Sequence, residues 1–193
     1  MKKNLEQICG NLDIITKKSD YNPLHTDPKQ KKLHDLIKGK GYYAKYNIDQ
    51  RARIWNRWKQ MTYVGVIFNL NAKGADCSRF NFSGVVFKGK TSFENANLEK
   101  ANLEYANLKN ANLKNVNLMS ACLPHAILYQ ANLEYANLRY ANFYGVNLAG
   151  ANLMGADFEY TIIWDATFAG VNLKDIKNLD KATHLDKARN LKC

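Results

Sequence analysis

The stretch that decides the fold reads Ala96-Asn97-Leu98-Glu99-Lys100-Ala101-Asn102-Leu103-Glu104-Tyr105, which is two copies of one five-residue unit. Seventeen such units follow one another without a slip from Thr91 to Asp175, each opening with a small, a polar and a large apolar residue. The small and large residues point to the same side of an extended segment. A period of five would turn successive pairs to opposite sides of a strand and spread them around a helix. The chain must therefore turn once per unit in the same sense, which predicts a β-solenoid.

Asn fills the polar position in eleven of the seventeen units. Such a row resembles a binding surface, but a short amide beside a turn also bonds the neighbouring backbone and tolerates turn geometry. The regularity of the row favours the turn role, so we predict no site residue within it.

The A-N-L-x-x run resembles the pentapeptide-repeat family, and the resemblance covers Thr91 to Asp175 without interruption. It implies a right-handed, four-sided β-helix with twenty residues per coil, whereas the period alone implies only a coil. Upstream, worn copies of the unit extend the array to about Val66, and the step of six between Phe87 and Phe93 predicts a small bulge near Lys90. We expect an all-β solenoid of about five to six coils over residues 65–176.

Both flanks are predicted to cover the open ends of the solenoid, because unpaired strand edges invite association. Residues 1–64 form a basic helical region, with helices expected over Leu5–Thr16, Asp27–Gly39 and Asp49–Met61. Residues 177–193 are expected to form a short C-terminal capping helix with Asp180 as its N-cap.

The net charge of +11 lies entirely in the flanks. Residues 65–175 hold nine basic and nine acidic side chains, whereas residues 1–64 carry a charge of +8 and residues 176–193 carry +3. The resemblance implies one known activity, because the best-known family members bind DNA gyrase as acidic mimics of DNA and give quinolone resistance. A mimic of DNA must present negative potential. The neutral solenoid disfavours this activity, which we keep as an alternative.

The third expected helix has two interpretations. Its Ile54, Trp55, Trp58 and Met61 share one side, which favours packing against the first coil. Its basic residues suggest an element that binds nucleic acid or an anionic membrane surface. The two are compatible, because a capping helix can also present basic groups to a partner. The candidate residues are Arg51, Arg53, Arg57 and Lys59.

Stacking at intervals of twenty residues predicts ladders on the outside of the solenoid. One ladder contains Tyr144 and Trp164 with Tyr105 and His125 beside it, and on another side Tyr140 lies over Tyr160. Exposed Tyr and Trp are enriched at binding hot spots, although stacked aromatic residues also stabilise sheets. We predict these six residues as the binding candidates of the solenoid.

No catalytic, metal-binding or cofactor-binding arrangement is evident. Cys122 and His125 lie three residues apart and could be imagined as nucleophile and base, but they share a flat wall with no third group. The four cysteines show neither a pairing rhythm nor a C-x-x-C spacing, and no apolar run approaches the length of a membrane span. We therefore expect a cytoplasmic chain that is not an enzyme and needs no cofactor.

The sequence thus predicts a non-enzymatic interaction or scaffold protein of bacterial type, which a host cell could also receive as an effector. A protein is the expected partner, because a flat wall suits a broad surface better than a small molecule. Two alternatives stay open: a gyrase-directed inhibitor, and a binder of nucleic acid or anionic surfaces through residues 1–64. The oligomeric state is not predicted.

Overall fold

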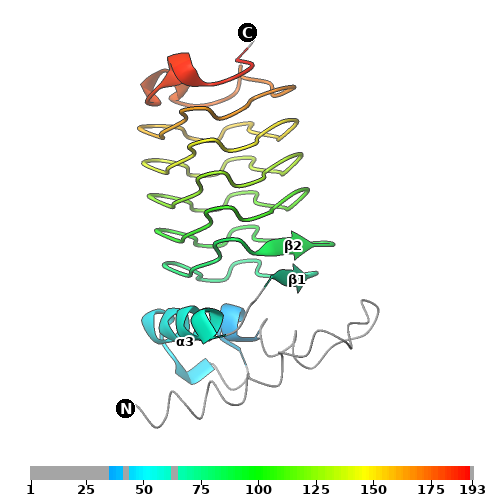
Figure 1. The fold of residues 1–193 in the computed structure, drawn as a ribbon, viewed down its shortest axis with the longest axis vertical. Coiled ribbons are helices and arrows are strands. Elements are labelled where there is room, and N and C mark those ends of the chain that lie inside the picture. Colours follow the sequence, from blue (N-terminus) through cyan, green and yellow to red (C-terminus); the bar gives the residue numbers. More distant parts are fainter. Residues whose placement is uncertain (1–34, 41–43, 62–64, 192–193) are drawn as a thin grey trace.

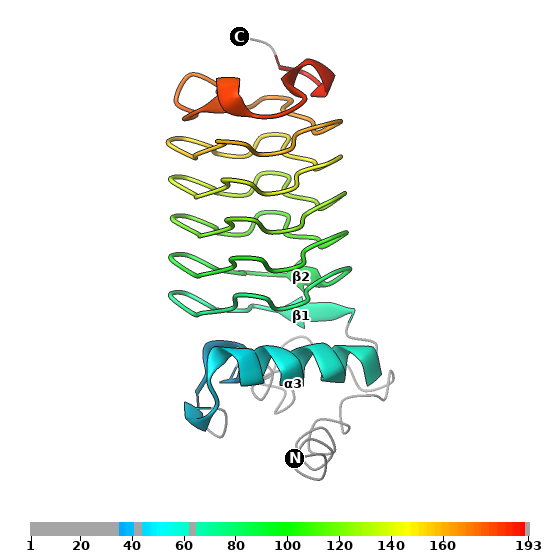
Figure 2. The same ribbon diagram turned by 90° about the vertical axis from the view of Figure 1, so that its left-hand side faces the viewer.

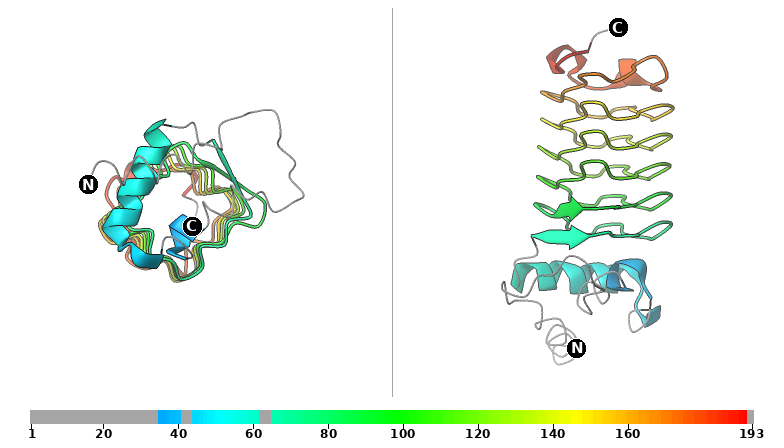
Figure 3. Two further views of the ribbon diagram at one scale, coloured as in Figure 1. Left: turned by 90° about the horizontal axis from the view of Figure 1, so that it is seen from below. Right: turned by 90° about the vertical axis from the view of Figure 1, so that its right-hand side faces the viewer.

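The chain forms a stack of parallel coils, as the five-residue period predicts (Figure 1). The computed structural model describes residues 35–40, 44–61 and 65–191. Parallel bridges join residues twenty positions apart, from Ser92↔Asn112 to Asn147↔Thr167, so twenty residues close one coil. The coils superpose when the molecule is viewed along its long axis (Figure 3). The predicted β-helix is confirmed.

Each unit ends in a turn whose hydrogen bond joins two consecutive units. The Ala101 N–H donates to the Leu98 carbonyl at 3.0 Å, and Lys100, the second central residue of this turn, has a φ of 57°. A positive φ at this place is the geometry of a type II turn. Asn97 Oδ1 accepts from the Glu99 N–H at 3.1 Å, and the same bond recurs along the row of Asn. The predicted turn role of the Asn row is confirmed.

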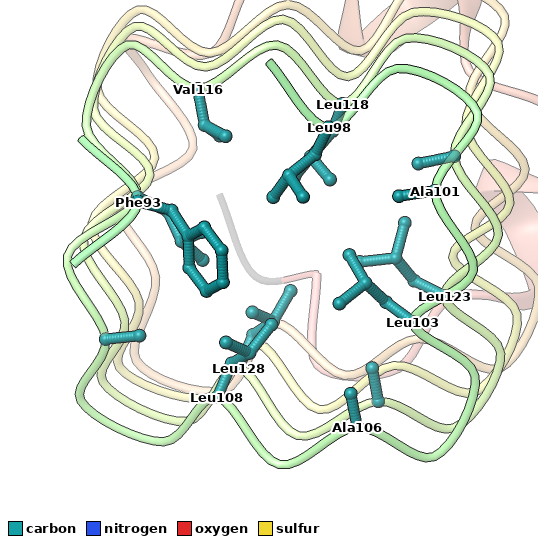
Figure 4. Packing of buried hydrophobic residues seen from close by; sticks show 14 of the residues in the cluster. Phe93, Leu98, Ala101, Leu103, Ala106, Leu108, Val116, Leu118, Leu123 and Leu128 are labelled. Atoms are coloured by element: carbon teal, nitrogen blue, oxygen red, sulfur yellow. The ribbon is translucent and has the colours of Figure 1, made fainter. Parts of the chain in front are cut away.

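The core is a column of stacked apolar side chains. Figure 4 shows Phe93, Leu98, Leu103 and Leu108 pointing inward from the four sides of one coil, and all four are fully buried. Thr161 replaces Ala at a small position and is also buried, where its Oγ1 donates to the Leu138 carbonyl at 2.7 Å. The hydrogen bond satisfies its hydroxyl, which explains why a polar residue is tolerated there.

The extra residue near Lys90 shifts the register by one. Strand β1 (Val66–Phe68) pairs in parallel with β2 (Val86–Lys88). Bridges such as Val86↔Asn107 then span 21 residues, and the interval returns to 20 at Ser92↔Asn112. The insertion therefore lies between these two bridges, as the predicted bulge requires.

Helix α3 (Ile48–Met61) crosses the open end of the first coil (Figure 2). Asn47 and Gln50 form a reciprocal capping box, in which each side-chain oxygen accepts from the other residue's backbone N–H at 2.9 and 3.0 Å. The predicted N-terminus at Asp49 is therefore one residue late. Residues 35–38 are helical and end at Gly39, where the second helix was expected to stop, whereas its start and the expected helix Leu5–Thr16 lie outside the described residues.

The packing of α3 satisfies backbone groups that have no coil beneath them. Trp55 is fully buried, its ring centroid lies 5.2 Å from that of Phe82, and its Nε1–H donates to the Asn81 carbonyl at 2.6 Å. Asn56 Oδ1 accepts from the Asn81 N–H at 2.8 Å. The predicted packing of the Trp stripe on the first coil is confirmed for Ile54 and Trp55, and the side chains of Trp58 and Met61 lie outside the described residues.

The C-terminal segment does not form the expected capping helix. It contains two short 3₁₀ turns, η3 (Leu179–Lys181) and η4 (Leu185–Lys187), and Asp180 lies within the first of them. Bridges Asp157↔Lys177, Ile162↔Thr183 and Thr167↔Arg189 carry the parallel pairing through this segment. The two sides from Lys177 to Thr183 and from Thr183 to Arg189 are therefore six residues long, and the boundary predicted at residue 176 lies inside the coiled structure.

Candidate functional site

Two rows of exposed aromatic residues border one wall of the solenoid. Residues 141–143 cross this wall between two turns, with Tyr140 at the turn before it and Tyr144 at the turn after it. One coil later, Tyr160 and Trp164 border residues 161–163 in the same way, and these four side chains are 40–51% exposed. We call this wall and its bordering turns the aromatic face. The predicted residues on it are Tyr105, His125, Tyr140, Tyr144, Tyr160 and Trp164.

The rings on this face stack along the solenoid axis. Tyr140 lies 5.2 Å from Tyr160 at an interplanar angle of 23°, and Tyr105 lies 5.1 Å from His125 at 15°. The His125 and Tyr144 rings meet edge to face at 5.0 Å. The sequence predicted these stacks but assigned Tyr140 and Tyr160 to a different side. The structure brings both sets to opposite borders of one wall.

The sequence analysis missed two further members of the aromatic face. Ile162 occupies an Asn position of the repeat and is 37% exposed, which makes the middle of the wall more apolar. The departure from Asn was a signal that could have identified it. His184 lies 5.0 Å from Trp164, but only the six-residue spacing of the last coil brings it there, and that spacing was not recognised.

Most charged groups beside the aromatic face are paired with one another. Glu159 contacts Arg139 and also accepts a hydrogen bond from Lys181 at 2.9 Å, which raises the pKa of Lys181. Asp165 pairs with Arg189. The Glu104 carboxylate has neither an ion pair nor a hydrogen bond among the residues that the structure describes. Asp180, in the turn that borders the face in the last coil, is likewise without an ion pair within that part of the chain.

The arrangement around Cys122 gives no support for nucleophilic chemistry. Burial raises the pKa of the Cys122 thiol, and the charge of Glu104 raises it further. A cysteine nucleophile needs a lowered pKa. Among the described residues no cluster of three His, Cys, Asp or Glu side chains could hold a metal ion. A hollow of about 170 Å³ beside the start of α3, lined in part by Asp49 and Arg79, is smaller than typical small-molecule sites.

The four basic candidates of α3 divide into three kinds. Arg53 and Arg57 are exposed, and neither has an ion pair within the described part of the chain. The side chain of Lys59 lies outside the described residues. Arg51 was expected on the exposed basic side, and that placement is wrong.

Arg51 is only 8% exposed and holds three elements together. Its Nη1 donates to the carbonyls of Leu36 and Ile37 at 3.3 and 2.8 Å, and Nη2 lies 3.4 Å from the Asp76 carbonyl. The guanidinium thus bonds the last carbonyls of the preceding helix, where a cation is favoured. Its role is structural, and it presents no charge to a partner.

No helix in the described ranges has both the length and the apolar character needed to cross a membrane.

Comparisons with known proteins agree on the repeat. Residues 96–134 and 136–175 match the family model described as pentapeptide repeats, in eight copies. No curated protein matches the chain.

Three solved structures illustrate the similarity. A pentapeptide repeat protein from the thylakoid lumen of Arabidopsis thaliana is 29% identical over 54% of this chain and 72% of its own, with a TM-score of 0.44. Rfr23, a pentapeptide repeat protein from the cyanobacterium Cyanothece 51142, is 35% identical over 55% of this chain, with a TM-score of 0.42, and this chain covers 66% of it. QnrB1, a plasmid-mediated fluoroquinolone resistance protein, is 18% identical over 58% of this chain and 69% of its own, with a TM-score of 0.30.

Proposed function

Because the repeat array of this chain belongs to the pentapeptide-repeat family, we propose that the chain is a non-enzymatic interaction or scaffold protein. Proteins of this family are generally structural or interaction proteins rather than enzymes. The chain binds a protein partner through the aromatic face, which the capped β-helix keeps rigid. One observation carries the proposal: Tyr140, Tyr160 and Trp164 are each more than 40% exposed on a single wall. Exposed Tyr and Trp gathered in this way mark interaction hot spots.

Affinity capture with the full chain tests this function. The bait proteins are the wild type, the double variant Tyr160→Asn/Trp164→Ser, and the control Tyr135→Asn, each incubated with a nuclease-treated lysate of the source organism at two salt concentrations. Tyr135 matches Tyr160, because both are about half exposed with φ values of 57° and 58°, but it lies at another corner. Asn tolerates a positive φ, so neither substitution strains the turn.

The expected result is a partner that the wild type and the control retain and that the double variant loses. Capture that is unchanged by the double variant would show that the aromatic face is not the binding surface.

The exposed arginines of α3 favour a second candidate function. Arg53 and Arg57 lie one helical turn apart, and residues 1–64 carry a net charge of +8. These features suit binding of nucleic acid or an anionic surface, which would weaken steeply with salt. The double variant Arg53→Gln/Arg57→Gln distinguishes it: loss of capture on this change, on nuclease treatment or at high salt would favour this function over the first.

Direction against DNA gyrase has less support. Residues 65–175 have equal numbers of basic and acidic side chains, whereas a protein that occupies the DNA-binding surface of gyrase would need a negative surface potential. A supercoiling assay with purified gyrase would show no inhibition by the wild-type chain if this reasoning is right.

The location of the chain is also part of the proposal. The thiols of Cys77 and Cys122 are both free, which fits a reducing compartment such as the bacterial cytoplasm. Delivery to a host cell as an effector stays a prediction.

A further inference from the structure

We propose that the aromatic face binds one amphipathic α-helix of a protein partner, laid along the solenoid axis with a basic residue at its end nearest Glu104. This inference rests on the proposed function and names the class of partner. It is carried by the orientation of the rings, by the charges around the face and by the pairing of the backbone.

The stacked rings present their edges to a partner. Tyr140 and Tyr160 lie in consecutive coils, one above the other, and their rings are within 23° of parallel. Their planes therefore lie across the axis, and each ring covers a face of the next. A sugar ring or a nucleobase stacks on a free aromatic face. The edges of Tyr140 and Tyr160, with Ile162 beside them on the wall, suit aliphatic side chains instead.

The charges beside the face favour a largely uncharged partner whose basic residues lie at an end of the bound segment. Glu159 is neutralised by Arg139 and Lys181, and Asp165 by Arg189. Two bordering carboxylates have no ion pair in the described part of the chain: Asp180, in the last coil, and Glu104, in the coil of Tyr105 at the other end of the face. Complementary charge fixes the orientation of a partner more than its affinity. A Lys or Arg at the corresponding end of the bound segment would meet the Glu104 carboxylate.

The backbone of the face leaves no room for an added strand. The Leu103 N–H donates to the Cys122 carbonyl at 2.7 Å, and the Cys122 N–H donates to the Ala101 carbonyl at 2.9 Å. Strand addition needs an edge with free N–H and C=O groups. The face is bonded to the coils above and below it, so a partner can contact only its side chains. A helix, which satisfies its own backbone, meets this requirement.

The dimensions of the face also fit a helix. Tyr105, His125, Tyr144, Trp164 and His184 lie in five successive coils, which span roughly 19 Å at ~4.8 Å per coil. A helix of about 13 residues has this length, close to the average in globular proteins. The two bordering rows are four positions apart along the chain, about 13 Å in an extended segment, against a helix diameter of about 10–12 Å.

A displayed library of random 16-residue peptides, selected on the folded full-length protein, tests the inference. Each enriched peptide is synthesised, and its affinity is measured for the wild type, Tyr160→Asn, the control Tyr135→Asn and Glu104→Gln. Circular dichroism of each bound peptide reports its helix content, and melting curves establish that every variant is folded.

Enriched peptides are expected to carry an apolar stripe at helical spacing and to gain helix on binding. Tyr160→Asn should weaken the affinity for these peptides on the order of tenfold or more, whereas Tyr135→Asn should change it less than about twofold. Glu104→Gln should weaken the affinity for peptides with a terminal Lys or Arg by roughly threefold and leave the affinity for uncharged peptides unchanged.

Three results would overturn the inference: no enrichment on the wild type, bound peptides that are not helical, or equal weakening by Tyr160→Asn and Tyr135→Asn. The lysate capture keeps the proposed function separate. If the captured partner depends on the aromatic face but the peptides are not helical, only the helical class of partner is wrong. If neither depends on the face, the proposed function fails as well.

Discussion

The second central residue of each turn holds an unusual conformation for the side chains found there. Tyr105, Tyr140 and Tyr160 all have φ between 55° and 60°, although Gly and Asn adopt this region most readily. A left-handed conformation costs an ordinary residue about 1 kcal/mol. Tyr135, at another corner, has a φ of 57° and is also half exposed, so the turn accepts a Tyr whether or not its ring belongs to the aromatic face.

Gly145 shows where a side chain at the same turn position is not tolerated. A Cβ added there would lie 2.6 Å from Nδ1 of His125, whereas a Cβ at Gly74, with a similar φ of 66°, would contact nothing within 4 Å. We expect both Gly145→Ala and Gly74→Ala to lose about 1 kcal/mol from backbone strain. Gly145→Ala should lose roughly 1 kcal/mol more, because the His125 ring must move. Urea unfolding of the two variants measures the difference, and equal losses would mean that His125 does not lie over Gly145.

The inward and outward positions of the unit predict opposite responses to lysine. Leu133 is fully buried, so Leu133→Lys places an unpaired charge in the core and should cost several kcal/mol, enough to abolish cooperative melting. Asn115 lies at an exposed turn with a φ of 55°, a conformation that Lys100 already adopts. Asn115→Lys gives up a hydrogen bond to Asn95 and the ease with which Asn adopts a positive φ, so it should cost only about 1 kcal/mol, far less than Leu133→Lys. Similar melting temperatures for the two variants would show the register to be wrong.

Cys77 should make stability fall at alkaline pH. Burial raises the pKa of its thiol from 9.0 to about 12, while the nearby charge of Arg51 opposes the rise. Above pH 9 the unfolded chain loses this proton and the folded chain keeps it, so the free energy of unfolding falls as the pH rises towards 12. Between pH 8 and pH 10.5 the wild type should lose about 2 kcal/mol more than Cys77→Ala. Parallel pH profiles would show that the thiol is not buried as described.

At the scale of elements, the sequence predicted the structure that covers the N-terminal end of the solenoid but not the structure of its C-terminal end. The Trp stripe of α3 identified the cap, because large aromatic residues at helical spacing are usually buried. The C-terminal Leu179, Ala182 and Leu185 are spaced by three, a spacing that suits both a helix and a six-residue coil repeat. Only the pairing with the coil before them decides between the two.

The cap itself yields a prediction. Trp55→Ala removes a fully buried ring and its hydrogen bond to Asn81, and it uncovers the Phe82 side chain. We expect a loss of about 3–5 kcal/mol and concentration-dependent association, because the end of the first coil becomes accessible. The matched control is Arg53→Ala on the exposed side of α3, which should change the stability by less than about 0.5 kcal/mol. Calorimetry and sedimentation check both, and identical behaviour of the two variants would contradict the capping role.

For the whole molecule, the sequence predicted the solenoid well and the surface only in part. The period of five determined which residues point inward, and the single step of six located the register shift near Lys90. The burial of Arg51 could not be predicted, because the carbonyls that it bonds belong to a helix end placed only by tertiary packing. The sequence analysis did not place Tyr140 and Tyr144 on the same wall, because it did not recognise that the turns before and after one segment both border it.

The distribution of charge separates the two surfaces that a partner could use. Residues 65–175 are neutral and carry most of the aromatic face, whereas the basic excess belongs to residues 1–64 and to the last coil and its tail, residues 176–193. A partner of the aromatic face should therefore bind with little dependence on salt, because apolar contacts are not screened. A partner bound through the exposed α3 arginines should dissociate as the salt concentration rises.

Site-specific photo-crosslinking of the full chain tests the central claim most directly. Benzoylphenylalanine replaces Tyr160 on the aromatic face, Tyr135 at another corner, or Arg57 on α3, and each protein is irradiated in a lysate of the source organism. The two tyrosine positions already hold exposed aromatic rings at a positive φ, so the larger benzophenone side chain can extend into solvent without moving the core. Binding through the aromatic face predicts a discrete protein adduct from position 160 and none from positions 135 and 57. An adduct that forms only from position 57 or position 135 would contradict it.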